Sequence, residues 1–107
     1  FYGRAWRQVP SSNKGLGQRA ATTGNMVYTQ RQIQELLASG STQRYFDQAA
    51  QSPWLYDGST FISYEDAESM AAKAAYIRQQ GLLGVSCWAL DQDATGTLVQ
   101  ALDAGLR

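Results

Sequence analysis

The sequence contains no histidine and one cysteine, Cys87, among its 107 residues. The absence of histidine excludes most zinc sites and the serine–histidine and cysteine–histidine pairs of nucleophilic catalysis. A single cysteine cannot form an internal disulfide bond. Cys87 lies in an apolar run, and because free cysteine is usually buried we expect it to be a small core residue. Nothing in the composition predicts a metal or an organic cofactor.

Clusters of like charge and long hydrophobic runs are absent too. Nine basic and nine acidic residues cancel, and the longest apolar runs are short. A nucleic-acid-binding face needs clustered Lys and Arg, and a membrane span needs about 20 apolar residues in succession. We therefore expect neither nucleic acid nor a membrane as a partner. The length fits one domain with a modest core.

The chain opens on an aromatic and arginine-bearing stretch, Phe1-Tyr2-Gly3-Arg4-Ala5-Trp6, which is typical either of an edge strand or of a strand that lines a site. Natural amino termini are usually polar and loosely held, so this opening predicts a segment of a longer protein. Residues 10–24 are rich in Ser, Asn, Gly and Thr and predict an exposed loop. Residues 26–28 are expected to add a short strand or to enter the next helix.

Two helices are predicted in the middle of the chain. Thr29 begins a Thr-Gln-Arg-Gln capping box, which predicts a helix from about residue 30 to residue 39. A second helix is expected over residues 65–80, because its apolar residues share one stripe and a glycine follows it. Either Ser63 or Asp66 can cap this second helix.

Short aromatic segments between these helices predict β structure. Residues 44–47 and 53–56 are two such segments, and residues 60–64 follow an Asp-Gly turn that favours a hairpin. We expect residues 24–77 to form an antiparallel sheet with at least one packed helix. The two ends of the chain are expected to be less regular or to pair with another molecule, because their strands expose free edges.

The last part of the chain has a different pattern. Residues 84–90, Gly-Val-Ser-Cys-Trp-Ala-Leu, are almost continuously apolar, which is typical of a parallel strand buried on both faces. Asp91 and Asp93 follow directly, and residues 96–106 predict a last helix. The fold class is therefore α+β in the middle, with a helix, a buried strand and a helix at the end.

Several residues are candidates for a site. Asp91 and Asp93 lie where α/β barrels bind ligands, although two short carboxylates before a helix commonly cap it instead. Trp88 either fills the core or forms the floor of a pocket, where its indole face can stack on a sugar ring. Arg4 is either a solvated strand residue or a donor to a substrate or an acid.

Three segments match motifs of one enzyme family, in the order in which that family has them. They are the Tyr-Gly-Arg segment at residues 1–6, the segment Phe61 to Asp66 with Ser69, Lys73 and Tyr76, and the Gly81 to Val85 and Trp88 to Asp93 run. Tyr28, Tyr45-Phe46-Asp47 and Pro53-Trp54 add weaker matches. With these motifs the chain resembles family 18 glycoside hydrolases, the chitinases.

The resemblance implies a division of the chain and a set of site residues. Residues 1–9 would be the end of strand seven of a TIM (β/α)8 barrel, residues 10–80 the chitinase insertion domain with its following helix, and residues 81–107 strand eight and the last helix. Substrate-binding residues would be Trp88, Arg4, Tyr2 and Trp6, with Asp91 and Asp93 as structural residues near the site. The insertion domain would form one wall of the substrate groove.

The resemblance also implies an activity. Family 18 enzymes hydrolyse the β-1,4 N-acetylglucosamine linkages of chitin with retention, using the substrate's own acetamide as nucleophile. The partners would be chitin or its oligosaccharides and the remainder of the barrel, and the location would be extracellular. The family's catalytic D-x-x-D-x-D-x-E run is not present in these residues, so we expect this chain to be inactive alone.

Two other functions stay open from the sequence. One is a chitin-binding, lectin-like relative without the catalytic glutamate, and the other is a structural module whose fold serves protein contacts. The sequence that precedes this chain in its protein would separate the first from a chitinase.

Overall fold

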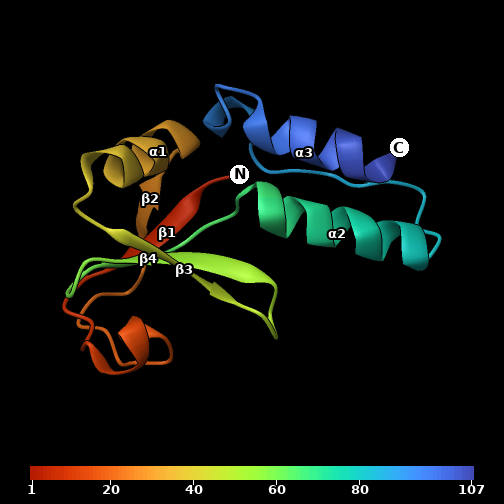
Figure 1. Ribbon diagram of the computed structural model, residues 1–107. Helices are drawn as coiled ribbons and strands as arrows, with labels where there is room; N and C mark the ends of the chain where they lie inside the picture. The colour runs from red at the N-terminus through yellow and green to blue at the C-terminus, as the bar shows by residue number, and fades with distance from the viewer.

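A computed structural model describes all residues from 1 to 107, and it contains one sheet and three α-helices (Figure 1). Five antiparallel strands are ordered β2-β1-β5-β4-β3. The α+β class and the antiparallel sheet with helices are therefore confirmed. The elements are β1 (Gly3–Trp6), β2 (Met26–Tyr28), α1 (Gln30–Ser39), β3 (Gln43–Asp47), β4 (Ser52–Tyr56), β5 (Phe61–Ser63), α2 (Ala67–Gln79) and α3 (Thr97–Leu106), with 3-10 turns at Ser12–Gly15 and Leu90–Gln92.

The first face of the sheet packs against α1. Ala5 pairs with Ile62 and Ile62 pairs with Leu55, so these three side chains point to the same face. They form a buried core with Ile33 of α1. Gly3 permits the close approach of the helix, since a Cβ there would lie 2.9 Å from the Ile33 side chain.

The capping box of α1 forms as the sequence predicts. The Gln32 amide donates to the Thr29 hydroxyl at 3.3 Å, and the Thr29 amide donates to the Gln32 side chain at 2.8 Å. The helix ends at Gly40, whose φ of 72° is left-handed. Its bounds, residues 30–39, are those expected.

The second helix begins two residues later than predicted. Asp66, not Ser63, is its N-cap, and Asp66 and Ser69 complete a reciprocal capping box. The last helix forms within the expected range, and α2 and α3 lie side by side (Figure 1). Their contact is a second core of Met70, Ala74, Leu98 and Leu102. No helix of the structure has the length and apolar character needed to cross a membrane.

The prediction of a buried strand at residues 84–90 is wrong for this chain. The segment has no strand pairing, and Val85, Cys87 and Trp88 are exposed. A parallel strand needs hydrogen-bonding neighbours, but both edges of β1 are already occupied by β2 and β5. The expected burial of Cys87 is wrong for the same reason. Remnants of a barrel are thus not directly seen.

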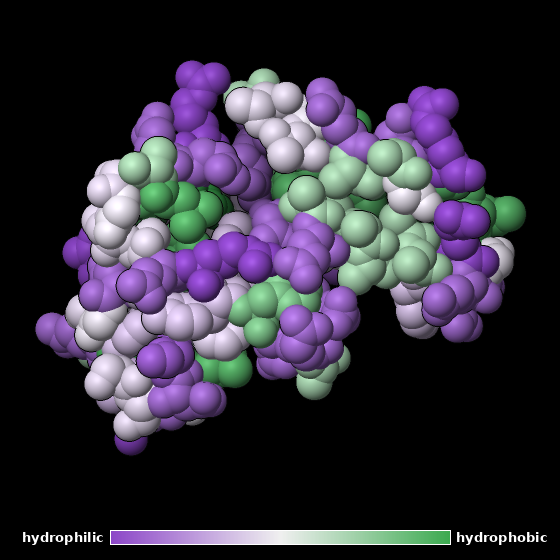
Figure 2. Space-filling view, in the orientation of Figure 1, coloured by the Kyte–Doolittle hydropathy of each residue, from purple (hydrophilic) through white to green (hydrophobic).

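Most of the large apolar side chains that are exposed lie in α2, in α3 or in the segment between them. Figure 2 shows apolar surface spread over the half that contains α2 and α3, whereas the sheet half is mainly hydrophilic or neutral. The large exposed apolar residues of the helical half include Leu82, Leu83, Val85 and Leu90. The expectation of less regular ends therefore holds for residues 82–90 but not for the packed helix α3. It is wrong for the start of the chain, because β1 is paired on both edges by β2 and β5, and the sheet extends beyond the expected residues 24–77.

Candidate functional site

A cleft of about 430 Å³ lies where β1, the start of α2 and residues 85–88 meet. Four of its lining residues are Tyr2, Arg4, Trp6 and Trp88, the four that the sequence predicts as substrate-binding. The first three alternate along one strand and so share one face, opposite to the face that packs on α1. Trp88 comes from the other end of the chain. The structure thus brings all four predicted residues together.

The Arg4 side chain is exposed and held by two neighbours. Its Nη1 atom donates to the carbonyl oxygen of Gly24 at 3.3 Å. Its guanidinium carbon lies 5.5 Å from the centre of the Tyr2 ring, within the range of a cation–π contact. The guanidinium is therefore oriented in the cleft while most of its donors stay free for a ligand.

The Trp6 indole lies beside Arg4 and is partly buried. Its ring makes an edge-to-face contact with Phe61 on β5, with centroids 6.0 Å apart. On another side it touches the backbone at Gly24. These contacts make Trp6 a fixed part of the cleft wall.

Trp88 is 80% exposed. The sequence left open whether this indole fills the core or forms the floor of a pocket. Its exposure excludes the core role in this chain. A large exposed indole in an aromatic cleft offers a flat apolar face to a ligand.

Asp91 and Asp93 do not line the cleft. Asp91 is exposed, whereas Asp93 is only 4% exposed and its Oδ2 atom accepts hydrogen bonds from the amides of Leu98 and Val99 at 3.0 and 3.1 Å. Those amides are among the unpaired donors of the first turn of α3. The N-cap position itself is Gly96, and Asp93 satisfies two first-turn amides from three residues before it. The expectation that these aspartates cap the following helix therefore holds for Asp93 and not for Asp91.

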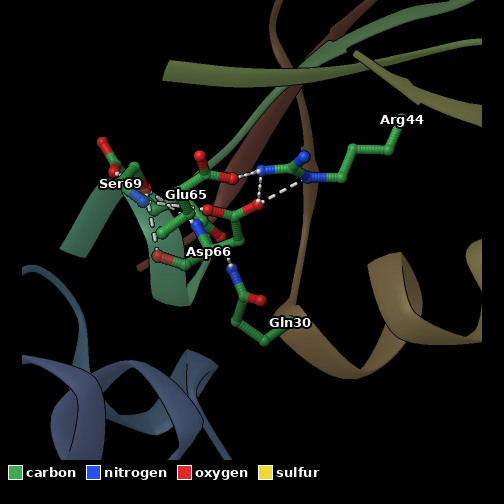
Figure 3. Close-up of polar contacts among 6 residues, drawn as sticks. Gln30, Arg44, Glu65, Asp66 and Ser69 are labelled. Atoms are coloured by element: carbon green, nitrogen blue, oxygen red, sulfur yellow. Dashed lines mark hydrogen bonds and ion pairs between the residues drawn. The ribbon is translucent and has the colours of Figure 1, made fainter. Parts of the chain in front are cut away.

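Glu65 and Lys73 also line the cleft, and neither was among the predicted site residues. They form a polar cluster with the buried Ser69, and Figure 3 shows the Glu65 and Ser69 part of it. The Ser69 hydroxyl donates to Glu65 Oε2 at 2.6 Å, and the Lys73 ammonium pairs with the other carboxylate oxygen. Glu65 is held in place by its backbone as well, since the Gln30 side chain donates to its carbonyl at 2.9 Å. The spacing of four residues along a helix is the sequence signal that could have found this cluster.

A second set of charged residues holds the start of α2, next to this cluster. Arg44 of β3 donates to Asp66 at 2.8 Å and to Glu68 at 2.7 Å (Figure 3). Because Asp66 is the N-cap of α2, the arginine ties the edge of the sheet to the start of that helix. Tyr64, which also lines the cleft, is buried, and burial together with the Asp66 charge raises its pKa to about 12.

No group of three or more cysteine, aspartate or glutamate side chains is placed to hold a metal ion. The cleft is instead a surface of aromatic rings and hydrogen-bonding groups. Flat apolar faces with polar groups between them suit a ligand that alternates apolar and polar faces, as a pyranose does.

Comparison with known proteins matches most of the chain to one family. The family described as Glycosyl hydrolases family 18 matches residues 1–93. Chitinase A1 of Niallia circulans is 34% identical over 116 residues, which cover 99% of this chain and 16% of that protein.

Solved structures resemble the chain closely as well. Chitinase ChiW from Paenibacillus sp. str. FPU-7, described as a cell-surface-expressed enzyme, is 37% identical with a TM-score of 0.89 and covers 99% of this chain and 10% of its own. A mutant class V chitinase from Nicotiana tobaccum in complex with NAG4 is 26% identical with a TM-score of 0.83, and the match covers 98% of this chain and 32% of that one. The chain therefore spans between a tenth and a third of the length of these relatives.

Proposed function

The chain belongs to glycosyl hydrolase family 18, and we propose on that premise that it is part of a chitinase, which hydrolyses the β-1,4 linkages between N-acetylglucosamine units in chitin. The observation that carries this proposal is the meeting of Tyr2, Arg4 and Trp6 with Trp88 in one cleft. Segments about 80 residues apart in sequence make one aromatic surface, and its chemistry suits a sugar chain.

We assign each cleft residue a role toward the sugar. Trp88 is the floor, on which the apolar face of one N-acetylglucosamine unit stacks. Tyr2 and Trp6 form the wall, and Arg4 donates hydrogen bonds to hydroxyl or carbonyl oxygens of the substrate. Residues 10–80 then deepen one side of a groove whose other side is the remainder of the barrel.

The reaction needs an acid that this chain does not supply. Glu65 is the only carboxylate that lines the cleft, and its two oxygens already accept from Ser69 and Lys73. In the mechanism that the family resemblance implies, the substrate's acetamide oxygen attacks the anomeric carbon with retention, and a carboxylic acid elsewhere in the protein protonates the leaving oxygen. We therefore propose that these 107 residues bind but do not hydrolyse.

An extracellular or cell-surface location fits this function, because chitin is an insoluble polymer outside the cells that degrade it. The cell-surface relative from Paenibacillus supports it.

Titration of the chain with the tetramer of N-acetylglucosamine tests the binding role. We expect saturable binding that Trp88→Ala weakens by about tenfold, which corresponds to about 1.4 kcal/mol. Leu83→Ala is the matched control, since Leu83 is a fully exposed apolar residue of the same segment that does not line the cleft. Equal loss in both variants, or no binding by the wild type, would contradict the role of the cleft.

A turnover assay with a chromogenic chitobioside tests the proposal that the chain alone does not hydrolyse chitin. We expect no hydrolysis by the purified chain above that of a mock preparation. Reading the sequence that precedes this chain in its protein for a D-x-x-D-x-D-x-E run separates a chitinase from a lectin-like relative.

A further inference from the structure

Gly24 contacts two cleft residues at once, and we propose that it is a positioning residue that fixes the Trp6 indole and the Arg4 guanidinium where a sugar meets them. The inference rests on the function proposed above, because it takes both side chains as sugar-binding. Gly24 does not line the cleft, so any effect it has on binding must act through these two residues.

The contact with Trp6 requires a glycine. A Cβ atom at position 24 would lie 2.2 Å from both Nε1 and Cε2 of the indole, far inside the van der Waals distance. The φ angle of 69° also belongs to the left-handed region, which side chains with a Cβ rarely adopt. The ring therefore rests directly on the glycine backbone, and any larger residue would have to displace it.

The contact with Arg4 uses the carbonyl of the same residue. Arg4 Nη1 donates to the Gly24 carbonyl oxygen at 3.3 Å, and the guanidinium carbon makes a cation–π contact with the Tyr2 ring, 5.5 Å from its centre. An exposed arginine that is not held samples many rotamers and loses that freedom when a ligand binds. The Gly24 carbonyl removes part of this loss before the ligand arrives.

Gly24 cannot simply move away, because its segment is tied on one side to Arg7, the residue after β1, and on the other side to β1 itself. Before it, the Thr22 hydroxyl accepts from the Arg7 amide at 2.9 Å and the Ala21 amide donates to the Arg7 carbonyl at 3.2 Å. After it, Met26 pairs with Ala5 in the sheet. A change at position 24 must therefore be absorbed mainly by the Trp6 and Arg4 side chains.

The test compares Gly24→Ala with Gly17→Ala in the full chain. Gly17 lies in the same loop with a φ of 74°, but a Cβ there would meet nothing within 4 Å. Both variants carry the strain of a left-handed alanine, and only Gly24→Ala pushes on Trp6. We expect Gly17→Ala to keep the near-ultraviolet circular dichroism of the tryptophans and the affinity for the N-acetylglucosamine tetramer.

Gly24→Ala should change the near-ultraviolet signal and weaken tetramer affinity about tenfold, or about 1.4 kcal/mol, at a temperature where its far-ultraviolet spectrum matches wild type. If it matches Gly17→Ala in both measurements, the inference is wrong while the proposed function stands. If the wild type binds no tetramer, the proposed function fails, and with it the sugar-binding part of the inference.

A double-mutant cycle tests the Gly24–Trp6 contact without any ligand. In the wild-type background Gly24→Ala should lower the thermal midpoint clearly more than Gly17→Ala. In a Trp6→Ala background the two changes should cost the same, because the ring that the new methyl group strikes is gone. A Gly24→Ala variant that unfolds but becomes stable when combined with Trp6→Ala reports the same contact. Equal costs in both backgrounds, or unfolding in both, would overturn it.

Discussion

Replacing Asp93 by alanine should destabilise the chain, although Asp93 lies outside the cleft. Its Oδ2 atom accepts from two amides of α3 at 3.0 and 3.1 Å, and the side chain is 4% exposed. In Asp93→Ala both amides lose their acceptor where water does not easily replace it.

The magnitude follows from these contacts. Removing an N-cap acceptor costs about 0.5–2 kcal/mol, and a buried donor left without a partner costs about 1–3 kcal/mol. The hydrogen bond from the Leu98 amide is buried and the one from the Val99 amide is partly buried, so we expect about 2 kcal/mol in total. At about 4–8 °C per kcal/mol for a domain of this size, the melting temperature should fall by about 10 °C.

The assay is thermal and urea unfolding followed by far-ultraviolet circular dichroism. Asp91→Ala is the matched control, because Asp91 is an exposed aspartate two residues away whose side chain makes no hydrogen bond, and it should stay within about 0.5 kcal/mol of wild type. Asp93→Asn keeps one acceptor oxygen and should cost less than alanine. If Asp93→Ala were as stable as Asp91→Ala, the cap would contribute nothing and the reasoning would fail.

Three further outcomes follow from burial and pairing. Trp88→Ala should lower the free energy of unfolding by only about 1 kcal/mol, because the indole is 80% exposed and burying the remaining fifth of its surface contributes little at about 25 cal/mol/Å². A loss of about 3–5 kcal/mol, as in a packed core, would contradict this. The raised pKa of Tyr64, about 12, makes stability fall as pH rises between 10 and 12, since the unfolded state then binds fewer protons. Tyr64→Phe should flatten that decline, and an unchanged alkaline profile would refute it. Amides of residues 84–90 should exchange with solvent much faster than those of β1, as hydrogen-exchange mass spectrometry can measure.

The sequence predicted the local elements well, because their signals are local. The capping box at Thr29 and Gly40 defines both ends of α1, and the Asp-Gly turn defines the hairpin of β4 and β5. The family resemblance, and not spacing, put four residues into one expected site; the structure places all four in one cleft, and their role in binding stays a prediction. Alternation along β1 alone shows that Tyr2, Arg4 and Trp6 share a face, but it says nothing about Trp88.

The failure at residues 84–90 has a physical cause. An apolar run predicts that a segment is stable when it is buried on both faces. It does not indicate which neighbouring strands or helices bury it. In this chain both edges of β1 are taken, so the run stays exposed and Cys87 with it. The polar cluster of Glu65 and Lys73 was missed for a related reason. Their spacing from Ser69, four residues on each side, predicts that they share a face, but it does not say that this face meets the cleft.

The cleft therefore has one rigid side and one loosely held side. β1 is hydrogen-bonded on both edges, and its side chains are held further by Gly24 and Phe61, whereas the segment that carries Trp88 belongs to no ladder. A sugar stacked on Trp88 would have to order that segment, at about 1–2 kcal/mol for each backbone residue fixed, so the affinity of the isolated chain should be low. Strands that pair with both edges of residues 84–90 would remove this cost before binding, raising affinity for the same sugar without touching it. The rest of a barrel would then contribute to substrate binding by ordering Trp88 as well as by supplying the acid.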